Sequence, residues 1–250
     1  MSAPPGLTGK VALVTGAARR IGATICRCLH EQGTNVAVHY RGSAAEAEAL
    51  CADLNDLRPN SALAVRADLA SIDRLPELVT TVTAWHGRLD ILINNASSFY
   101  PTPLGEITEA HWDDLVGSNL KAPLFLSQAA APELRKARGV IINIVDIHAQ
   151  RPLRNHAVYG SAKAGLAMLT RALAKDLAPE IRVNGVSPGA ILWPDAGLSE
   201  QTKASILRQI PAGRPGAADD IAACVLYLVR DAGYVTGQII AVDGGRSIGW

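Results

Sequence analysis

The sequence is poor in cysteine, with four thiols in 250 residues. Cys26, Cys28, Cys51 and Cys224 show no paired CxxC spacing, so neither a structural zinc site nor a disulfide framework is indicated. We therefore expect reduced thiols, a cytoplasmic protein and no bound metal ion.

The chain also lacks a surplus of charge and a long apolar run. Lys and Arg number 24 against 23 for Asp and Glu, a net charge of +1. No global field therefore favours nucleic acid, an anionic membrane or a polyanionic partner. Nowhere do eighteen apolar residues follow one another, and residues 1–6 lack a basic region followed by an apolar stretch. We expect no membrane segment and no leader, so any anion site has to be local.

The chain does have a regular alternation of short apolar runs with longer segments of helical period, which predicts βαβ units. Its 48% hydrophobic content and its length suit a single α/β domain over 1–250, with an N-terminal arm at 1–9. We predict a Rossmann-like, doubly wound, parallel seven-stranded sheet with helices on both faces. The expected strands are Val11–Thr15, Val36–Tyr40, Ala62–Arg66, Ile91–Asn94, Val140–Val145, Arg182–Val186 and Gln238–Val242. The expected helices are Ile21–Gln32, Ala44–Leu57, Ile72–Trp85, His111–Ala137, Ala157–Ala178 and Asp219–Val229.

Three irregular stretches begin beyond predicted strand ends, where ligands bind in such sheets. They are Ser97–Gly105, His148–Asn155 and Pro188–Gly216, and residues 190–216 are expected to form a substrate loop or lid. Within it Trp193 is a candidate substrate contact, although packing against a helix at 199–210 explains it equally well.

A glycine turn follows the first predicted strand, at Thr15-Gly16-Ala17-Ala18-Arg19-Arg20-Ile21-Gly22. Gly16 permits a sharp turn and Gly22 a close backbone approach, so free N–H groups at the helix start can face a pyrophosphate. Such a turn alone is often only a loop, but its position after the first of seven strands favours dinucleotide binding.

The end of the second predicted strand reads His39-Tyr40-Arg41-Gly42-Ser43, where folds selective for NAD usually place an acid. No acid is present. Arg41, with Ser43 and either Arg19 or Arg20, could hold a 2′-phosphate, which predicts NADPH; the alternative is a solvated arginine. After the third strand, Asp68-Leu69 could contact the adenine, or Asp68 could begin the next helix as an N-cap.

Tyr159 and Lys163 are four residues apart at the start of a predicted helix, and therefore on one face of it. A free tyrosine titrates near pH ~10, and a nearby ammonium and a cationic nicotinamide both lower that value. The pair predicts proton-coupled hydride transfer.

Thr15–Gly22, Asn94-Asn95-Ala96, Asn119, Tyr159 with Lys163, and Ser187-Pro188-Gly189 resemble the motifs of the short-chain dehydrogenase/reductase family over nearly the whole chain. The resemblance implies that Asn119 holds a water relay to Lys163, that Lys163 bonds the nicotinamide ribose and that Tyr159 delivers a proton. The cofactor site that it implies comprises Gly16, Arg19, Arg20, Ile21, Gly22, His39, Tyr40, Arg41, Ser43, Asp68, Leu69, Asn95, Ala96, Ser97, Tyr159, Lys163, Pro188 and Gly189.

Two positions depart from that family pattern. Arg20 replaces the central glycine of the turn, and Asp146 replaces a serine thirteen residues before Tyr159. A carboxylate repels a developing alkoxide, but it suits a nitrogen heterocycle that carries N–H donors. The alternative is a structural carboxylate paired with Arg151 or Arg154.

With these departures, Arg20, the segment Asn95–Leu104, Val145-Asp146 and the pair Tyr159/Lys163 are similar to the pteridine reductase subgroup. The resemblance implies that Phe99 stacks on a pterin, that Ser97 and Arg20 hold its polar edge and the cofactor phosphates, and that Asp146 acts with Tyr159 in protonating a ring nitrogen. Gly42 stands where this subgroup tends to have a basic residue, so NADPH preference is expected to be weaker.

The resemblance also implies a homotetramer through residues 111–137 and 157–178, with Arg246–Trp250 near a neighbouring subunit's site. The expected substrate is a small pterin or folate, most simply a dihydropterin. The alternatives are a carbonyl reductase of the 3-oxoacyl thioester type and a non-catalytic nucleotide-sensing protein. His148 and His156 are assigned no chemistry, since lone loop histidines are usually solvated.

Overall fold

The protein is described by a computed structural model, which covers residues 6–191, 197 and 199–248. Seven strands form one parallel sheet in the order β3-β2-β1-β4-β5-β6-β7, as predicted. Chain order reverses between β1 and β4, and such a reversal opens a crevice at the carboxyl ends of the strands. The strands are β1 Val11–Val14, β2 Asn35–Tyr40, β3 Ala62–Arg66, β4 Ile91–Asn94, β5 Val140–Ile144, β6 Arg182–Pro188 and β7 Ile239–Val242.

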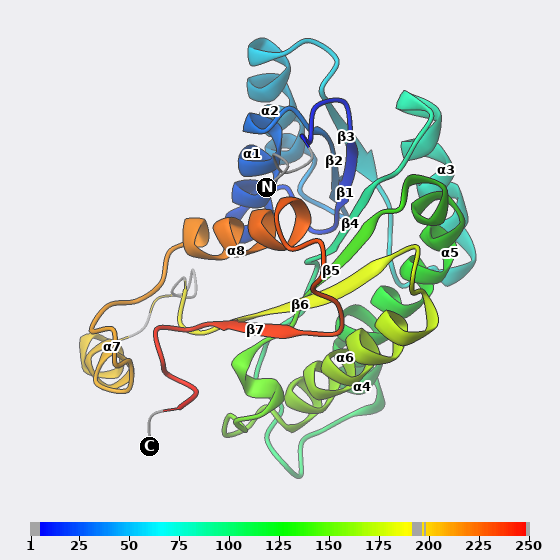
Figure 1. Cartoon of the computed structure of the whole chain (residues 1–250). Coiled ribbons are helices and arrows are strands. Elements are labelled where there is room, and N and C mark those ends of the chain that lie inside the picture. Colours follow the sequence, from blue (N-terminus) through cyan, green and yellow to red (C-terminus); the bar gives the residue numbers. More distant parts are fainter. Residues whose placement is uncertain (1–5, 192–196, 198, 249–250) are drawn as a thin grey trace.

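Helices cover both faces of the sheet (Figure 1). One face carries α1 Arg20–Glu31, α2 Ala44–Leu57 and α8 Ala218–Arg230, which contribute to one buried apolar cluster. The other carries α3 Leu75–His86, α5 Ala122–Ala137 and α6 Ala157–Asp176, with α4 Glu109–Val116 beside α6. The central strands β1 and β4 are buried on both faces, which is why they read as continuous apolar runs.

Two predicted helices are interrupted by proline. Pro76 lies in the first turn of α3, so residues Ile72–Arg74 form a separate 3₁₀ turn (η1). The predicted helix His111–Ala137 is divided by a π-helical segment, η2 Gly117–Lys121. Pro123 has no N–H to donate to the carbonyl group of Asn119, while Ala122 N–H donates to Gly117 O across the wider π turn.

The stretch predicted to form the substrate loop contains α7 Glu200–Leu207, which lies within the helix expected at 199–210. Ser199 begins this helix by accepting a hydrogen bond from Thr202 N, at 3.2 Å. A further short 3₁₀ turn, η3 Ile147–Ala149, follows β5. Trp193 lies outside the described residues.

A buried polar chain joins the sheet to α6 below the strand ends. Asn94 Nδ2 donates to Asn143 Oδ1 at 2.8 Å, and Asn143 Nδ2 donates to Thr170 Oγ1 at 2.9 Å. Each side chain is fully or almost fully buried, so each has to find a partner inside the protein. The chain fixes β4, β5 and α6 relative to one another, and these elements carry the predicted catalytic residues or lead into them.

The four cysteines are unpaired. Among the helices of the described ranges, none is long and apolar enough to cross a bilayer.

Candidate active site

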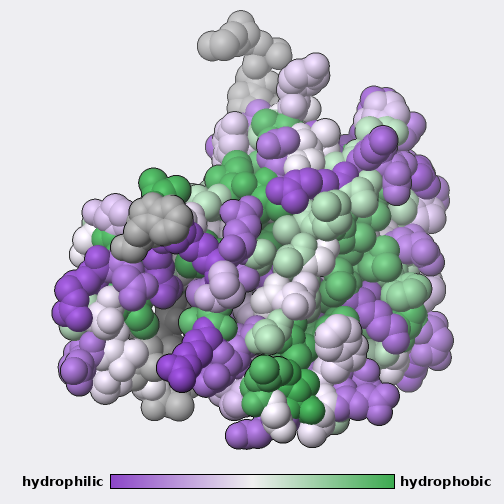
Figure 2. All heavy atoms as spheres, turned by 90° about the horizontal axis from the view of Figure 1, so that it is seen from below, coloured by the Kyte–Doolittle hydropathy of each residue, from purple (hydrophilic) through white to green (hydrophobic). Residues whose placement is uncertain are grey.

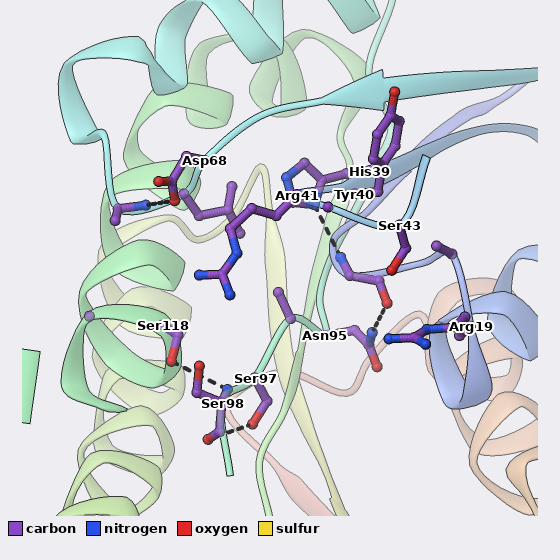
Figure 3. Close-up of a pocket in the computed structure, with 18 of the residues that line it drawn as sticks. Arg19, His39, Tyr40, Arg41, Ser43, Asp68, Asn95, Ser97, Ser98 and Ser118 are labelled. Atoms are coloured by element: carbon purple, nitrogen blue, oxygen red, sulfur yellow. Dashed lines mark hydrogen bonds between the residues drawn. The ribbon is translucent and has the colours of Figure 1, made fainter. Parts of the chain in front are cut away.

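A cavity of about 540 Å³ opens at the switch between β1 and β4 (Figure 3). Fourteen of the residues predicted to bind the cofactor line it, namely Gly16, Arg19, Arg20, Ile21, Gly22, His39, Tyr40, Arg41, Ser43, Asp68, Leu69, Asn95, Ala96 and Ser97. The tertiary structure therefore brings together residues from four separate strand ends. Tyr159, Lys163, Pro188 and Gly189 do not line this cavity and lie farther along the same edge of the sheet.

The glycines of the turn are required by close backbone contacts. Gly16 has φ +59°, and a Cβ atom there would lie 2.8 Å from Ala96 Cα. At Gly22 a Cβ atom would lie 2.6 Å from Gly16 O and 2.7 Å from Asn95 Nδ2. No larger residue fits either position without a shift of the backbone.

Arg20 has a left-handed backbone conformation, with φ +56°. This explains why glycine is usual at this position in the family: a residue with a Cβ atom pays about 1–3 kcal/mol for such a conformation. Strain of this kind is retained where the side chain serves a purpose. Arg20 also lines the cavity, in agreement with a role at the predicted phosphate site.

The start of α1 is arranged for an anion. Its N-cap residue, Arg19, forms no capping hydrogen bond through its side chain, and the first turn contains no acidic residue. Asn95 Nδ2 donates to Thr15 O at 2.8 Å and to Gly16 O at 3.0 Å, which holds the turn against β4. Unused N–H groups and the positive end of the helix dipole suit the pyrophosphate of a dinucleotide.

The His39 side chain forms a hydrogen bond with the backbone of this glycine turn. Its Nδ1 accepts a hydrogen bond from Gly16 N at 3.1 Å, and its Nε2 lies 3.2 Å from Ala67 O, to which it can donate. Burial lowers the pKa of His39 to about 4, and the hydrogen bond to Ala67 only partly opposes this. The ring is therefore neutral at physiological pH and joins β1, β2 and β3.

This burial predicts a pH dependence of stability. The unfolded chain binds a proton at His39 near pH 6.5 and the folded protein only near pH 4, so stabilisation is complete above pH 6.5 and lost as the pH falls to 4. The loss at low pH is on the order of 3 kcal/mol. Urea unfolding measured across this range checks it. A His39→Gln variant should show a shallower slope, and an equal slope in both proteins would contradict the prediction.

At the ribose end, the Arg41 side chain extends into the cavity (Figure 3). Arg19 Nη1 lies 3.5 Å from Glu46 Oε1 in an exposed ion pair, so Glu46 partly neutralises the charge of Arg19. Asp68 Oδ1 accepts a hydrogen bond from Ala70 N at 3.1 Å, so Asp68 closes a local turn and is not the N-cap of α3.

Asp146 and Tyr159 are in direct contact. Tyr159 Oη donates to Asp146 Oδ2 at 2.8 Å, and Asp146 Oδ1 accepts from His148 N at 2.8 Å. Lys163 Nζ donates to Ile144 O at 2.9 Å and lies 5.8 Å from the centroid of the Tyr159 ring. Tyr159 and Lys163 are both buried.

The protonation of this pair differs from the prediction. Burial, the negative charge of Asp146 and the hydrogen bond to it raise the pKa of Tyr159 well above its usual value, although a hydrogen bond with Ser97 opposes them. Burial lowers the pKa of Lys163 to about 8, against the attraction of Asp146. Burial is the largest of these causes, and the direct contact with Asp146 adds to it. Tyr159 is therefore a firmly protonated acid.

Asn119 lies in the π segment and is fully buried. Its Oδ1 accepts from Ser97 Oγ at 2.7 Å, and its Nδ2 donates to Ser98 O and to Leu115 O, each at 2.9 Å. The side chain thus anchors the loop after β4. The predicted water relay between Asn119 and Lys163 stays a prediction.

Phe99 is 51% exposed and lies beside the reactive tyrosine. Its ring is stacked on His156, with centroids 4.8 Å apart and planes at 19°. It also makes an edge contact with Tyr159, again with centroids 4.8 Å apart. His156, to which the sequence assigned no chemistry, thus packs against the ring that is predicted to stack on a pterin.

The cavity is also lined by four residues of α4 and its continuation that were not predicted from the sequence: Asp113, Asp114, Gly117 and Ser118. Ser98 N donates to Ser118 Oγ at 3.3 Å, and Tyr100 Oη donates to Asp114 Oδ2 at 3.0 Å. The only signal in the sequence was their closeness to Asn119, since nothing in the pattern shows which face of that helix meets the loop.

Known proteins resemble this chain along nearly its whole length. A family model described as enoyl-(acyl carrier protein) reductase matches residues 16–247. Pteridine reductase 1 of Leishmania tarentolae is 39% identical over 282 aligned positions, covering 96% of this chain and 97% of that protein. A 3-oxoacyl-[acyl-carrier-protein] reductase of Staphylococcus aureus is 40% identical, covering 94% and 97%.

Among solved structures, a putative short-chain alcohol dehydrogenase from Sinorhizobium meliloti superposes with a TM-score of 0.92 at 33% identity, covering 98% of both chains. The seven-stranded parallel sheet, the glycine turn and the buried Tyr159–Lys163 pair agree with this likeness. The chain is an oxidoreductase that belongs to the short-chain dehydrogenase/reductase family.

Proposed function

We propose that this oxidoreductase reduces pterins, in the first place dihydropterins to tetrahydropterins, with NADPH as the hydride donor. The observation that carries the proposal is the 2.8 Å hydrogen bond between Tyr159 Oη and Asp146 Oδ2. A carboxylate in this place repels the alkoxide that forms from a ketone, whereas it accepts hydrogen bonds from the N–H groups of a heterocycle.

The reaction adds a hydride to the carbon of a ring C=N bond and a proton to the adjacent nitrogen. Tyr159 holds the proton, since its raised pKa keeps the phenol protonated at neutral pH. Loss of that proton leaves a phenolate beside the Asp146 carboxylate, so the proton transfer places two negative charges side by side. Lys163, with a pKa of about 8, is positively charged at neutral pH and offsets part of this negative charge.

The cavity at the glycine turn fits the dinucleotide that supplies the hydride. Gly16 and Gly22 allow the backbone to approach a pyrophosphate, and α1 presents its free N–H groups there. Arg41 and Ser43 line the cavity at the end of β2, where no acid is present to hold an unphosphorylated ribose. These features support NADPH over NADH.

Both enzymatic candidates have support from relatives. The Leishmania tarentolae protein is named as a pteridine reductase, and the Staphylococcus aureus protein of similar identity is named as a 3-oxoacyl-[acyl-carrier-protein] reductase. Asp146 and the half-exposed Phe99 beside Tyr159 favour a flat nitrogen heterocycle. A 3-oxoacyl thioester reductase is the second candidate.

Cofactor oxidation by the purified enzyme separates these candidates. The panel contains dihydrobiopterin, dihydromonapterin, dihydrofolate, an oxidised pterin and a 3-oxoacyl thioester, each with NADPH and with NADH. We expect the highest kcat/KM with a dihydropterin and NADPH. Turnover of the thioester alone would overturn the proposal in favour of the second candidate, and binding of NADPH without turnover of any substrate would favour a nucleotide sensor.

The homotetramer stays a proposal. Figure 2 shows hydrophobic residues spread over part of the face seen from below, away from a largely hydrophilic region. Trp112 on α4 is 52% exposed and Met168 on α6 is 63% exposed, which suits helices that pack against another subunit. Sedimentation showing only monomer would remove this idea.

A further inference from the structure

Two loops that follow neighbouring strands are joined beside Tyr159. Thr102 N, in the loop after β4, donates to Asn155 O, in the loop after β5, at 2.6 Å. Thr102 and His156 also pair as an isolated parallel bridge, and Thr102 is buried. The loop that carries Phe99 is therefore fixed to the residue at which α6 begins.

The backbone just before Phe99 is held by the π-helical segment η2. Ser98 N donates to Ser118 Oγ at 3.3 Å (Figure 3), and Ser98 O accepts from Asn119 Nδ2 at 2.9 Å. The loop is thus fixed at Ser98 on one side of Phe99 and at Thr102 on the other. The direction of the Phe99 ring then depends on the side chains that surround it.

Two residues in the first turn of α6 contact the Phe99 ring. His156 is the N-cap residue, and Gly160 N donates to His156 O at 2.8 Å, so His156 and Tyr159 lie on one side of this turn. The His156 ring stacks on Phe99 with centroids 4.8 Å apart and planes at 19°, and Tyr159 makes an edge contact at 4.8 Å. Phe99 is still 51% exposed, so a large part of its ring is open to a ligand.

The His156 ring has a defined orientation of its own. Its Nδ1 atom lies 2.8 Å from Arg154 O. A carbonyl oxygen can only accept a hydrogen bond, so Nδ1 carries the proton and donates it. This bond sets the plane of the imidazole, and the nearly parallel stack sets the plane of the Phe99 ring in turn.

We propose that His156 is a positioning residue for the substrate: it holds the Phe99 ring in the orientation in which that ring stacks on a flat heterocycle. This inference rests on the proposed pterin reduction. Because His156 and Tyr159 share the first turn of α6, the stacking ring and the proton donor are held together. Removal of the imidazole therefore weakens pterin binding and leaves the proton transfer itself unchanged.

The test uses two substitutions that separate the ring of His156 from its hydrogen bond. His156→Phe keeps a flat ring for Phe99 but has no N–H for Arg154 O, whereas His156→Asn keeps a donor and suits an N-cap but has no ring. With NADPH and dihydrobiopterin, His156→Asn is expected to raise KM about 3- to 10-fold, the usual contribution of an aromatic pair, and His156→Phe less than about twofold. His86→Ala is the matched control, because it removes a half-buried histidine that contacts another aromatic ring, Trp85, at the end of α3.

Three further measurements separate positioning from a general structural role. The kcat of His156→Asn is expected to stay near wild type, and its affinity for NADPH to stay unchanged. Binding of biopterin to the enzyme with NADP⁺ is expected to weaken by the same factor as KM rises. In a Phe99→Leu background, His156→Asn is expected to have no further effect on KM, because His156 acts through Phe99.

An unchanged KM in His156→Asn overturns the inference, and so does a loss confined to kcat, an equal loss of NADPH affinity, or full additivity with Phe99→Leu. A larger effect of His156→Phe than of His156→Asn also overturns it, since the hydrogen bond and not the ring would then matter. If His156→Asn does not fold, His156→Leu, which fills space without an aromatic ring, takes its place. If wild type neither binds biopterin nor reduces dihydrobiopterin, the proposed function itself fails; if it does both and the histidine variants equal it, only the inference fails.

Discussion

Replacement of Tyr159 by Phe is expected to lower kcat for the NADPH-dependent reaction by about 10²–10⁴-fold, the usual contribution of a general acid. The phenol is the group that holds a proton beside the reacting centre, 2.8 Å from Asp146 Oδ2. The phenylalanine ring fills the same space, so the contact with Phe99 and the fold are kept. Single-turnover oxidation of NADPH with a dihydropterin measures the chemical step.

Tyr100→Phe is the matched control, because Tyr100 also donates to a carboxylate, Asp114 Oδ2 at 3.0 Å. Its hydroxyl does not contact Asp146 or Lys163, so kcat is expected to stay near wild type. The acid role of Tyr159 is wrong if both phenylalanine variants lose activity equally. Unchanged NADPH affinity in Tyr159→Phe shows that the loss lies in the proton transfer.

Replacement of Asp146 by Ser is expected to exchange the substrate class. Serine donates a hydrogen bond that stabilises an alkoxide, while the carboxylate can only accept one when it is ionised. We expect kcat/KM for dihydropterins to fall by about 100-fold and reduction of a 3-oxoacyl thioester to rise. Removal of the negative charge also removes a cause of the raised pKa of Tyr159, so that pKa falls.

Asp146→Asn separates charge from shape. It keeps the size and shape of the side chain but removes the negative charge, and its single carbonyl oxygen can replace only one of the two acceptors that face Tyr159 Oη and His148 N. Loss of pterin reduction in both variants, with gain of ketone reduction only in the serine variant, fits the proposal. Ketone reduction by wild type that survives unchanged in Asp146→Ser favours the carbonyl reductase.

The fold followed from local patterns with little ambiguity. Strands β3 and β4 have the predicted bounds, and α2 does as well. These elements are bounded by turn residues and carry a clear apolar pattern, which is local information. The errors occurred at Pro76 and Pro123, where a missing N–H changes the type of helix without ending the apolar pattern.

The site was less predictable wherever a long-range contact determines it. Ser97 meets Asn119, and Phe99 meets His156, across sequence distances that periodicity does not address.

By itself the sequence determined the parallel sheet, the glycine turn and the one face that carries Tyr159 and Lys163, because backbone sterics and helical period depend on neighbouring residues. Only the tertiary structure decided the protonation of that pair. Burial and the direct bond to Asp146 together raise the pKa of the phenol, whereas the motif alone predicted that the ammonium and a cationic nicotinamide would lower it. A pKa depends on what surrounds the group in space, and that is fixed by the fold.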